Sequence, residues 1–263
     1  MLRIIQELFR FLSNLFGNPI ITVNRTFPVH NNSPEKLNIK TATRDLEPFT
    51  RIASDVAANI YVVHGQNHHT MTITAEEHVI SKITSNVREG TLYLTTSGSY
   101  RSKTKIEVRI DLADLKWLRS RDTGNVDVDG SNEELFELSH EGVGDLQYRG
   151  SAHELVVMTS ATGNTHISGV SAGKLVVNAQ GVGNLRMEGH SSTLNLVSQS
   201  TGNVNLQNLS VFRANIQVSG VGNVKLDVTE KLTGRVTGVG NVTVTGRPLV
   251  EVKNQGVGSF RVK

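Results

Sequence analysis

The sequence has no cysteine, only five prolines, and few aromatic residues, which make up 5% of its 263 positions. The absence of cysteine excludes disulfide bonds, a thiol nucleophile and zinc sites built on cysteine ligands. Five prolines leave little room for a long linker between domains. No apolar run reaches the roughly 18 residues that a membrane-spanning helix needs.

The sequence also lacks a large excess of positive or negative charge, because 27 lysines and arginines nearly balance 24 acidic residues to give a formal net charge of +3. Lysine and arginine are scattered along the chain. The nearest thing to a basic cluster is Arg101, Lys103 and Lys105, followed by Arg119 and Arg121. This scatter is typical of solvated strand positions rather than of a phosphate-binding surface, so we expect no nucleic-acid partner.

Glycine, in contrast, is abundant, with 24 residues, and it recurs in a regular step. Eight glycines are followed by asparagine or a close substitute, at intervals of 20, 19, 20, 19, 20, 18 and 18 residues. The pairs are Gly124-Asn125, Gly144-Asp145, Gly163-Asn164, Gly183-Asn184, Gly202-Asn203, Gly222-Asn223, Gly240-Asn241 and Gly258-Ser259. Self-similarity at a fixed period indicates a repeat architecture.

Each Gly-Asn step is followed by an apolar/polar alternation. The first and third residues after the asparagine are apolar in every unit, with the single exception of Thr165. Alternation with a period of two predicts a strand with one buried face. A second apolar stretch such as "LVVMTS" precedes the next step, so each unit reads as turn, strand, turn, strand.

A unit of about 20 residues cannot close a core alone, whereas stacked units bury a continuous one. Stacking superimposes equivalent turns. We expect glycine there for a corner with positive φ and for the close approach of neighbouring backbones. Asparagine tolerates the left-handed region and bonds to adjacent backbone, so it suits a ladder along the stack.

We therefore predict an all-β fold, a single right-handed parallel β-helix (β-solenoid) with coils of about 20 residues. Residues 20–263 form the solenoid, with irregular coils to about 121 and regular repeats over 122–263. One unit per coil is favoured over a coil of two units. The alternation between "TGN" and "GVGN" turns has no explanation at this level. Residues 75–83 predict a short helix, and "REGTLYL", residues 88–94, predicts a hairpin turn into a strand.

The first 19 residues predict an amphipathic helix. Their polar residues up to position 16 fall within one arc of about 120°, and Gly17, Asn18 and Pro19 end the pattern. Two interpretations stay open: the helix covers the open end of the solenoid, or residues 1–16 lie in a membrane interface. A degenerate secretory signal is a third.

Motifs that carry chemistry are weak. "GVGN" differs from a phosphate-binding loop because a strand, not a helix, follows it. The outward columns of the predicted strands stack no two acids on neighbouring coils, and Asp111 and Asp114 are expected to flank a turn. His64, His68, His69 and His78 have only Glu76 or Glu77 nearby as a carboxylate partner, so we expect no metal site and no cofactor.

The chain from about Phe49 to Val244 resembles a bacterial family, the putative auto-transporter adhesin head domain or GIN domain. The resemblance rests on "FTRIASDVAANIYVVHGQNHHTMTITAEEHVISKITSNVREGTLYLTT", followed by the Gly-Asn repeats. It implies a right-handed parallel β-helix placed in the cell envelope or outside the cell, with no catalytic motif to carry over. The family pattern also leads us to expect a signal peptide or a lipoprotein cysteine at the start, and neither is evident.

These observations favour a non-enzymatic, adhesin-like binding or structural module that binds an unknown protein or glycan ligand. The alternative is a carbohydrate-active β-helix enzyme, a polysaccharide lyase or hydrolase. A third possibility is a membrane-associated scaffold recruited through residues 1–16.

Overall fold

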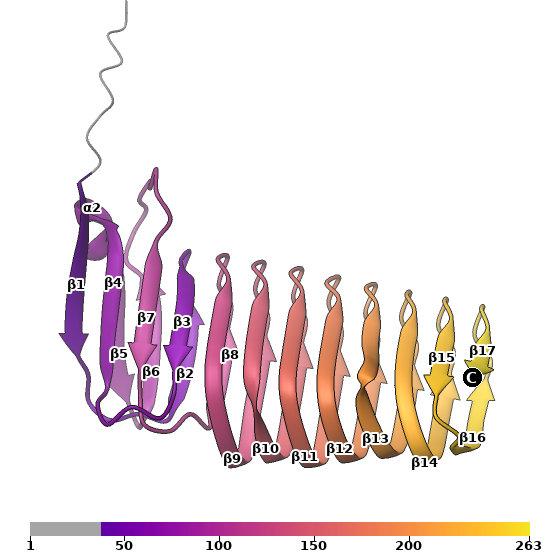
Figure 1. Ribbon diagram of the computed structural model, residues 1–263. Helices are drawn as coiled ribbons and strands as arrows, with labels where there is room; N and C mark the ends of the chain where they lie inside the picture. The colour runs from indigo at the N-terminus through magenta and orange to yellow at the C-terminus, as the bar shows by residue number, and fades with distance from the viewer. Residues whose placement is uncertain (1–37) are drawn as a thin grey trace, which may run out of the picture. The chain divides into compact units, whose positions relative to one another are not determined.

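The computed structural model describes residues 38–263 (Figure 1). The predicted amphipathic helix of residues 1–19, and with it the choice between a cover and a membrane segment, lies outside the described residues. Within residues 38–263, no helix combines the length and the apolar character that crossing a bilayer requires.

The regular part of the chain is a parallel β-solenoid, in a fold of about seven turns. Six long strands each trace most of one coil: β9 (Val126–His140), β10 (Leu146–Thr159), β11 (Thr165–Ala179), β12 (Leu185–Ser198), β13 (Val204–Val218) and β14 (Val224–Val236). Leu146 pairs with Val126 on one side and with Thr165 on the other. One repeat therefore makes one coil, as the sequence predicts. Three shorter strands continue the stack: β15 (Val242–Thr245), β16 (Leu249–Asn254) and β17 (Phe260–Val262).

Residues 38–120 form the other end of the stack from eight shorter strands and one helical turn. These are β1 (Ile39–Asp45), β2 (Arg51–Asp55), β3 (Asn59–Val63), β4 (Thr70–Glu76), α2 (Glu77–Ile80), β5 (Ile83–Arg88), β6 (Thr91–Thr96), β7 (Glu107–Asp111) and β8 (Trp117–Ser120). The short helix and the hairpin turn are both confirmed, since β5 and β6 pair antiparallel around Glu89 and Gly90, with φ of 48° and 68°.

The coils at this end do not stack in the order of the chain. The coil made by β2 and β3 pairs on one side with β6 and β7. On its other side it pairs with β8 and the start of β9. The first coil of the sequence is therefore enclosed between two later ones, and the sequence period alone did not predict this.

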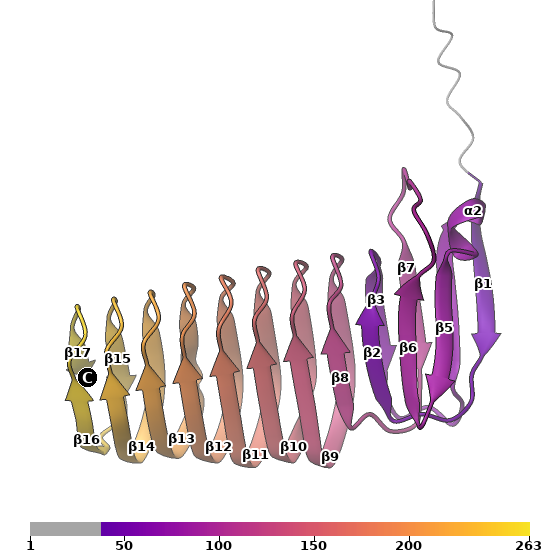
Figure 2. The same cartoon turned by 180° about the vertical axis from the view of Figure 1, so that it is seen from behind.

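Two faces run along the solenoid, with the core between them (Figures 1 and 2). The first face consists of β1, β4, β7, β3, the first halves of β9 to β14, β15 and β17. The second face consists of β5, β6, β2, β8, the second halves of the long strands, and β16. In Figure 1 the narrow Gly-Asn turns follow the upper edge and the wider arches the lower edge.

The core is a column of aliphatic side chains that the period-two pattern places inside, such as Leu155 and Val157. Phe136 and Tyr148 stack within it, with ring centroids 4.8 Å apart. Thr165, the exception in the apolar pattern, is buried like its neighbours, and its hydroxyl satisfies buried His140 through a 2.8 Å hydrogen bond to Nδ1. A polar side chain is tolerated here because it has a partner.

Burial of His140 leads to a pH-dependent stability. Burial lowers the pKa of this imidazole below its ordinary value of 6.5, because the charged form loses its hydration. The neutral form therefore stabilises the fold above the unfolded pKa, and that contribution is lost as pH falls through the lower folded pKa.

We expect His140→Gln to reduce the loss of unfolding free energy between pH 7 and about pH 5 in urea titrations. The same replacement of exposed His153 serves as the matched control. An unaltered profile in the His140 variant would contradict the assignment.

The glycines of the repeat are required by close backbone contact. A Cβ added to Gly144, Gly163 or Gly183 would lie 2.0, 2.0 or 1.8 Å from the carbonyl oxygen of the equivalent glycine one coil earlier. The expected left-handed corner is present only in the last three coils, where Gly222, Gly240 and Gly258 have φ of 151°, 143° and 144°. For the five earlier glycines, which are Gly124, Gly144, Gly163, Gly183 and Gly202, the positive-φ expectation is wrong. Glycine is still required at these five positions, because the backbone of the neighbouring coil leaves no space for a Cβ.

The residue that follows each of these glycines forms a ladder. In each coil its side-chain oxygen accepts a hydrogen bond from the backbone N–H of the equivalent residue in the next coil. Donor and acceptor are 2.7–3.2 Å apart from Asn125 and Asp145 through Asn164, Asn184, Asn203, Asn223 and Asn241 to Ser259. The ladder begins one coil earlier than the repeat, because Asn59 Oδ1 accepts from Asn125 N at 3.0 Å.

The alternation between "TGN" and "GVGN" turns coincides with an alternation in side-chain size. It occurs at the position two residues before the glycine of each Gly-Asn pair. In the three "TGN" coils this position holds Asp122, Ala161 and Ser200, all buried. In the intervening coils it holds Gly142, Gly181 and Gly220, where an added Cβ would lie 2.0–2.3 Å from the carbonyl oxygen of the preceding coil. A buried side chain in one coil is thus followed by a glycine in the next.

Candidate functional site

A groove crosses the first face where the out-of-order coil meets the regular ones. We call it the Tyr61 groove. It has a volume of about 370 Å³ and is lined by Tyr61, Val62, Val63, Thr72, Thr74, Glu107, Arg109, Asp127, Asp129 and Arg149. These residues come from β3, β4, β7, β9 and β10, which the stacking order brings side by side.

Tyr61 lies at the middle of this groove. It occupies an outward position of β3, with Arg109 of β7 as its register partner on one side and Asp127 of β9 on the other. Its side chain is exposed, at 38%. In the part of the chain that the structure describes, no arginine or aromatic ring stacks on Tyr61. One aromatic ring is therefore open to a ligand between charges of opposite sign.

Two arginines that line the groove form ion pairs. Arg109 holds Asp111 through two hydrogen bonds of 2.8 and 3.2 Å. Arg149 Nη1 donates to Asp129 Oδ1 at 2.9 Å. These pairs orient donors and acceptors along the groove, as a polar ligand requires.

Three other hollows are less suited to hold a ring-shaped ligand. The one beside Trp117 has its aromatic ring covered by Arg51 and Arg119, whose guanidinium carbons lie 4.9 and 5.7 Å from the ring centroid. The one beside Tyr93 lies on the second face, on the edge strand β5 and its partner β6. The one near the C-terminal coils is lined by Lys225, Arg261 and Lys263 without an aromatic ring.

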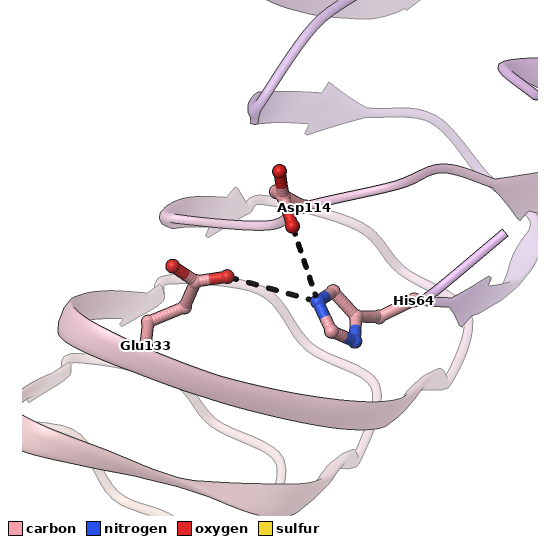
Figure 3. Close-up of side chains that lie close together, drawn as sticks. All are labelled: His64, Asp114 and Glu133. Carbon is pink, nitrogen blue, oxygen red and sulfur yellow. Dashed lines mark ion pairs between the residues drawn. The ribbon is translucent and has the colours of Figure 1, made fainter. Parts of the chain in front are cut away.

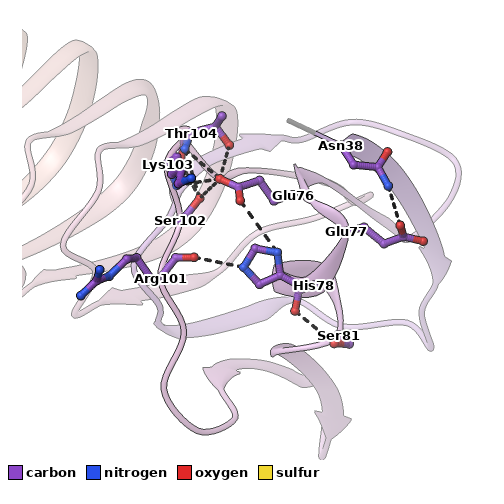
Figure 4. A network of polar contacts seen from close by, with 9 residues as sticks. All are labelled: Asn38, Glu76, Glu77, His78, Ser81, Arg101, Ser102, Lys103 and Thr104. Carbon is purple, nitrogen blue, oxygen red and sulfur yellow. Dashed lines mark hydrogen bonds and ion pairs between the residues drawn. The ribbon is translucent and has the colours of Figure 1, made fainter. Parts of the chain in front are cut away.

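The histidines singled out in the sequence do not come together. His69 packs edge-on against Phe49, with centroids 5.2 Å apart. His78 lies beside Glu76, but Glu76 is occupied by the backbone N–H groups of Lys103 and Thr104 at 2.6 and 3.1 Å (Figure 4). The hydrogen bond from the Lys103 amide is the main cause of the lowered pKa of Glu76. This carboxylate anchors the loop before β7.

His64 has partners that the sequence spacing did not indicate. Its Nε2 lies 3.9 Å from Asp114 Oδ1 and 3.6 Å from Glu133 Oε1 (Figure 3). The expectation that only Glu76 or Glu77 could serve the histidines is therefore wrong, because folding brings residues 64, 114 and 133 together. Asp114 does lie in the turn between β7 and β8, and Asp111 ends β7, as expected.

The basic residues also have local roles. Arg121 Nε donates to Glu141 Oε2 at 2.7 Å, and Arg119 lies over Trp117. They are spread over strands and a loop of the second face and its edge, so they make no continuous cationic stripe in the part of the chain described here.

Comparison with known proteins agrees with this architecture. Three solved structures share the fold at low identity. A putative adhesin from Bacteroides fragilis is 22% identical with a TM-score of 0.65, and the match covers 86% of this chain and 97% of that one. A putative adhesin from Parabacteroides distasonis is 17% identical with a TM-score of 0.75, over 86% and 97%. A structure described as a putative lipid binding protein from Parabacteroides distasonis is 16% identical with a TM-score of 0.73, over 85% and 97%.

Among curated proteins, the comparison finds no match. The family model of the putative auto-transporter adhesin, head GIN domain, matches residues 48–248, which is most of the chain and nearly the span on which the sequence resemblance rests. The chain therefore belongs to the head GIN domain family of putative auto-transporter adhesins.

Proposed function

We propose that this protein is a non-enzymatic, adhesin-like binding module of the bacterial cell envelope, and that it holds a glycan in the Tyr61 groove. Membership in the adhesin family supports the surface location and the adhesin-like role. The observation that carries the ligand class is the exposed, unstacked ring of Tyr61 between Arg109 and Asp127.

A glycan fits this arrangement chemically. A sugar ring has an apolar face that packs on an aromatic ring, and hydroxyls at its rim that both donate and accept hydrogen bonds. Guanidinium and carboxylate groups on either side of Tyr61 supply the complementary donors and acceptors. Because the groove crosses several strands, a ligand of more than one residue can lie along it.

The carboxylates of the Tyr61 groove bear on the choice between a binding and a catalytic role. A glycosidase needs a carboxyl group that gives up a proton and a second that stays ionised across the scissile bond. In the Tyr61 groove, Asp129 is engaged by Arg149 as the acceptor of an ion pair. Glu107 and Asp127 are the other carboxylates that line the groove, and they have no ion pair among the described residues, so an assay for polysaccharide cleavage tests them as a catalytic pair.

A glycan array with two tyrosine variants tests the proposal. The ligand that wild-type protein selects should bind Tyr61→Ala at least about tenfold more weakly, because stacking of one ring contributes on the order of 1.4 kcal/mol. Tyr93→Ala is the matched control, since Tyr93 is 42% exposed but lies on the second face. It should bind as the wild type does.

Two outcomes would contradict the proposal. Equal binding by both variants would exclude the Tyr61 groove as the site. Release of shortened or unsaturated products from acidic polysaccharides, with or without Ca²⁺, would instead show the carbohydrate-active enzyme that we set aside.

A further inference from the structure

We propose that His64, Asp114 and Glu133 bind one divalent transition-metal ion of the Zn²⁺ class. The three residues each offer one ligand atom, and these atoms lie within 4.8 Å of one another. Figure 3 shows both carboxylates directed toward the imidazole, that of Asp114 from the loop before β8 and that of Glu133 from β9. The site is separate from the Tyr61 groove and shares no lining residue with it.

The imidazole nitrogen that faces the carboxylates is otherwise unsatisfied. His64 Nε2 is buried and has no hydrogen-bond partner among the described residues. Its distances of 3.6 and 3.9 Å to the carboxylate oxygens are too long for hydrogen bonds. A buried ring nitrogen without a partner is costly, and a metal ion between the three groups would satisfy it.

The separations favour one class of metal. In a tetrahedral Zn²⁺ site with bonds of about 2.0–2.1 Å, ligand atoms lie about 3.4 Å apart. The distances of 3.6 and 3.9 Å from His64 Nε2 need to close by only a few tenths of an ångström, and the two carboxylate oxygens lie within 4.8 Å of each other. Mg²⁺ demands octahedral geometry with ligand atoms about 3 Å apart, and Ca²⁺ takes six to eight oxygen ligands. One imidazole and two carboxylates match Zn²⁺ better than either.

The backbone holds the three segments in place before any metal binds. His64 N donates to Asp129 O at 3.2 Å, which ties β3 to the strand that carries Glu133. Gly65 N donates to Ala113 O at 3.0 Å, which ties it to the turn that carries Asp114. Gly130, with φ of 81°, brings β9 alongside the ring, where an added Cβ would lie 3.7 Å from Nδ1.

Exposure of the ligands leaves room for a fourth, solvent ligand. The Glu133 side chain is 14% exposed and that of His64 is 21%, whereas Asp114 is 63% exposed. The ion would therefore be held from inside by two residues and reached from solvent past the third. It would join the out-of-order coil to the loop before β8 and to the first regular coil.

Co²⁺ and Zn²⁺ titrations of the full chain, made without a polyhistidine tag, test the proposal. We expect one equivalent of Co²⁺ to give the visible absorption of a four-coordinate site, Zn²⁺ to displace it, and Zn²⁺ to raise the Tm. Glu133→Gln should weaken binding of both ions at least about tenfold. Glu134→Gln, the matched control at the next position, should bind as the wild type does.

Two spectra together distinguish a metal ligand from a residue that only supports the fold. Loss of a ligand removes the Co²⁺ absorption alone, whereas loss of folding also changes the circular dichroism. His64→Gln should abolish the Co²⁺ absorption while retaining the β signal. Absence of one-equivalent binding by the wild type would overturn the proposal. Binding that is equally strong in the Glu133 and His64 variants would overturn it as well.

Discussion

Replacing Gly183 with alanine is expected to destabilise the protein by about 3 kcal/mol or more, which is the upper range for overpacking. The added Cβ would lie 1.8 Å from Gly163 O and 2.6 Å from its carbonyl carbon. Both atoms belong to the backbone of a neighbouring coil, so no side-chain rotation relieves the contact. Two coils must separate, and the ladder bond between Asn164 and Asn184 is strained with them.

The matched control is Gly173→Ala, another glycine of the regular coils whose φ lies outside the left-handed region. A Cβ there would lie 2.9 Å from His153 Cε1, at the end of an exposed side chain that can rotate away. We expect a change of about 1 kcal/mol or less, in either direction. Equal urea midpoints for the two variants would contradict the close-contact explanation of the repeat glycines.

Asp122→Ala is expected to loosen the attachment of the out-of-order coil, at a cost of about 2–4 kcal/mol for several buried groups left unpaired. Asp122 Oδ1 accepts from Ser54 Oγ at 2.7 Å and from Val56 N at 2.8 Å, while Oδ2 accepts from Ser120 Oγ at 2.9 Å. The carboxyl group thus joins the coil of β2 and β3 to the turn after β8.

The same variant has a pH signature. Burial raises the pKa of Asp122 above its ordinary value of 3.8, although the hydrogen bonds oppose this. A raised folded pKa means that the contribution of this group to stability is largest below pH 3.8 and falls as pH rises through the folded pKa. The penalty of Asp122→Ala should therefore be larger at acidic pH than at pH 7. Asp127→Ala, on the outer surface of the same coil, should cost about 0.5 kcal/mol or less at either pH; similar losses in both variants would contradict the role of Asp122.

The sequence was sufficient to predict the regular half of the fold because each coil repeats the same constraints. Gly163, Asn164 and the alternating residues after them meet the same neighbours as their equivalents one coil away, so period and spacing determine structure. Thr165 shows the limit of the pattern. Its hydroxyl has buried polar partners in His140 and Thr159, and no local rule links positions 140 and 165.

The order of the first coils could not be predicted for a related reason. The step at Ala58-Asn59 carries the ladder asparagine and the strand pattern Ile60 and Val62, but alanine replaces the glycine. Recognised as a repeat, this step would have placed β2 and β3 in the stack. Its position between later coils depends on pairing between β3 and residues 107–129, which is a long-range contact without a sequence period.

Both candidate sites lie where this long-range pairing occurs, and for that reason neither was visible in the sequence. Tyr61 reads as one outward strand residue until β7 and β9 flank it with Arg109 and Asp127. His64 reads as an exposed turn histidine until residues 114 and 133 reach it. The regular coils, which the sequence predicts well, carry mixed outward columns that indicate no ligand.

Hydrogen–deuterium exchange with the glycan selected on the array is the measurement that tests the binding site most directly. The account predicts protection in four segments, residues 59–63, 107–111, 126–129 and 146–149, the first three of which come together only through the out-of-order stacking. The second face should exchange as in the free protein. Protection confined to the C-terminal coils, residues 203–263, or to the second face would contradict the Tyr61 groove as the site.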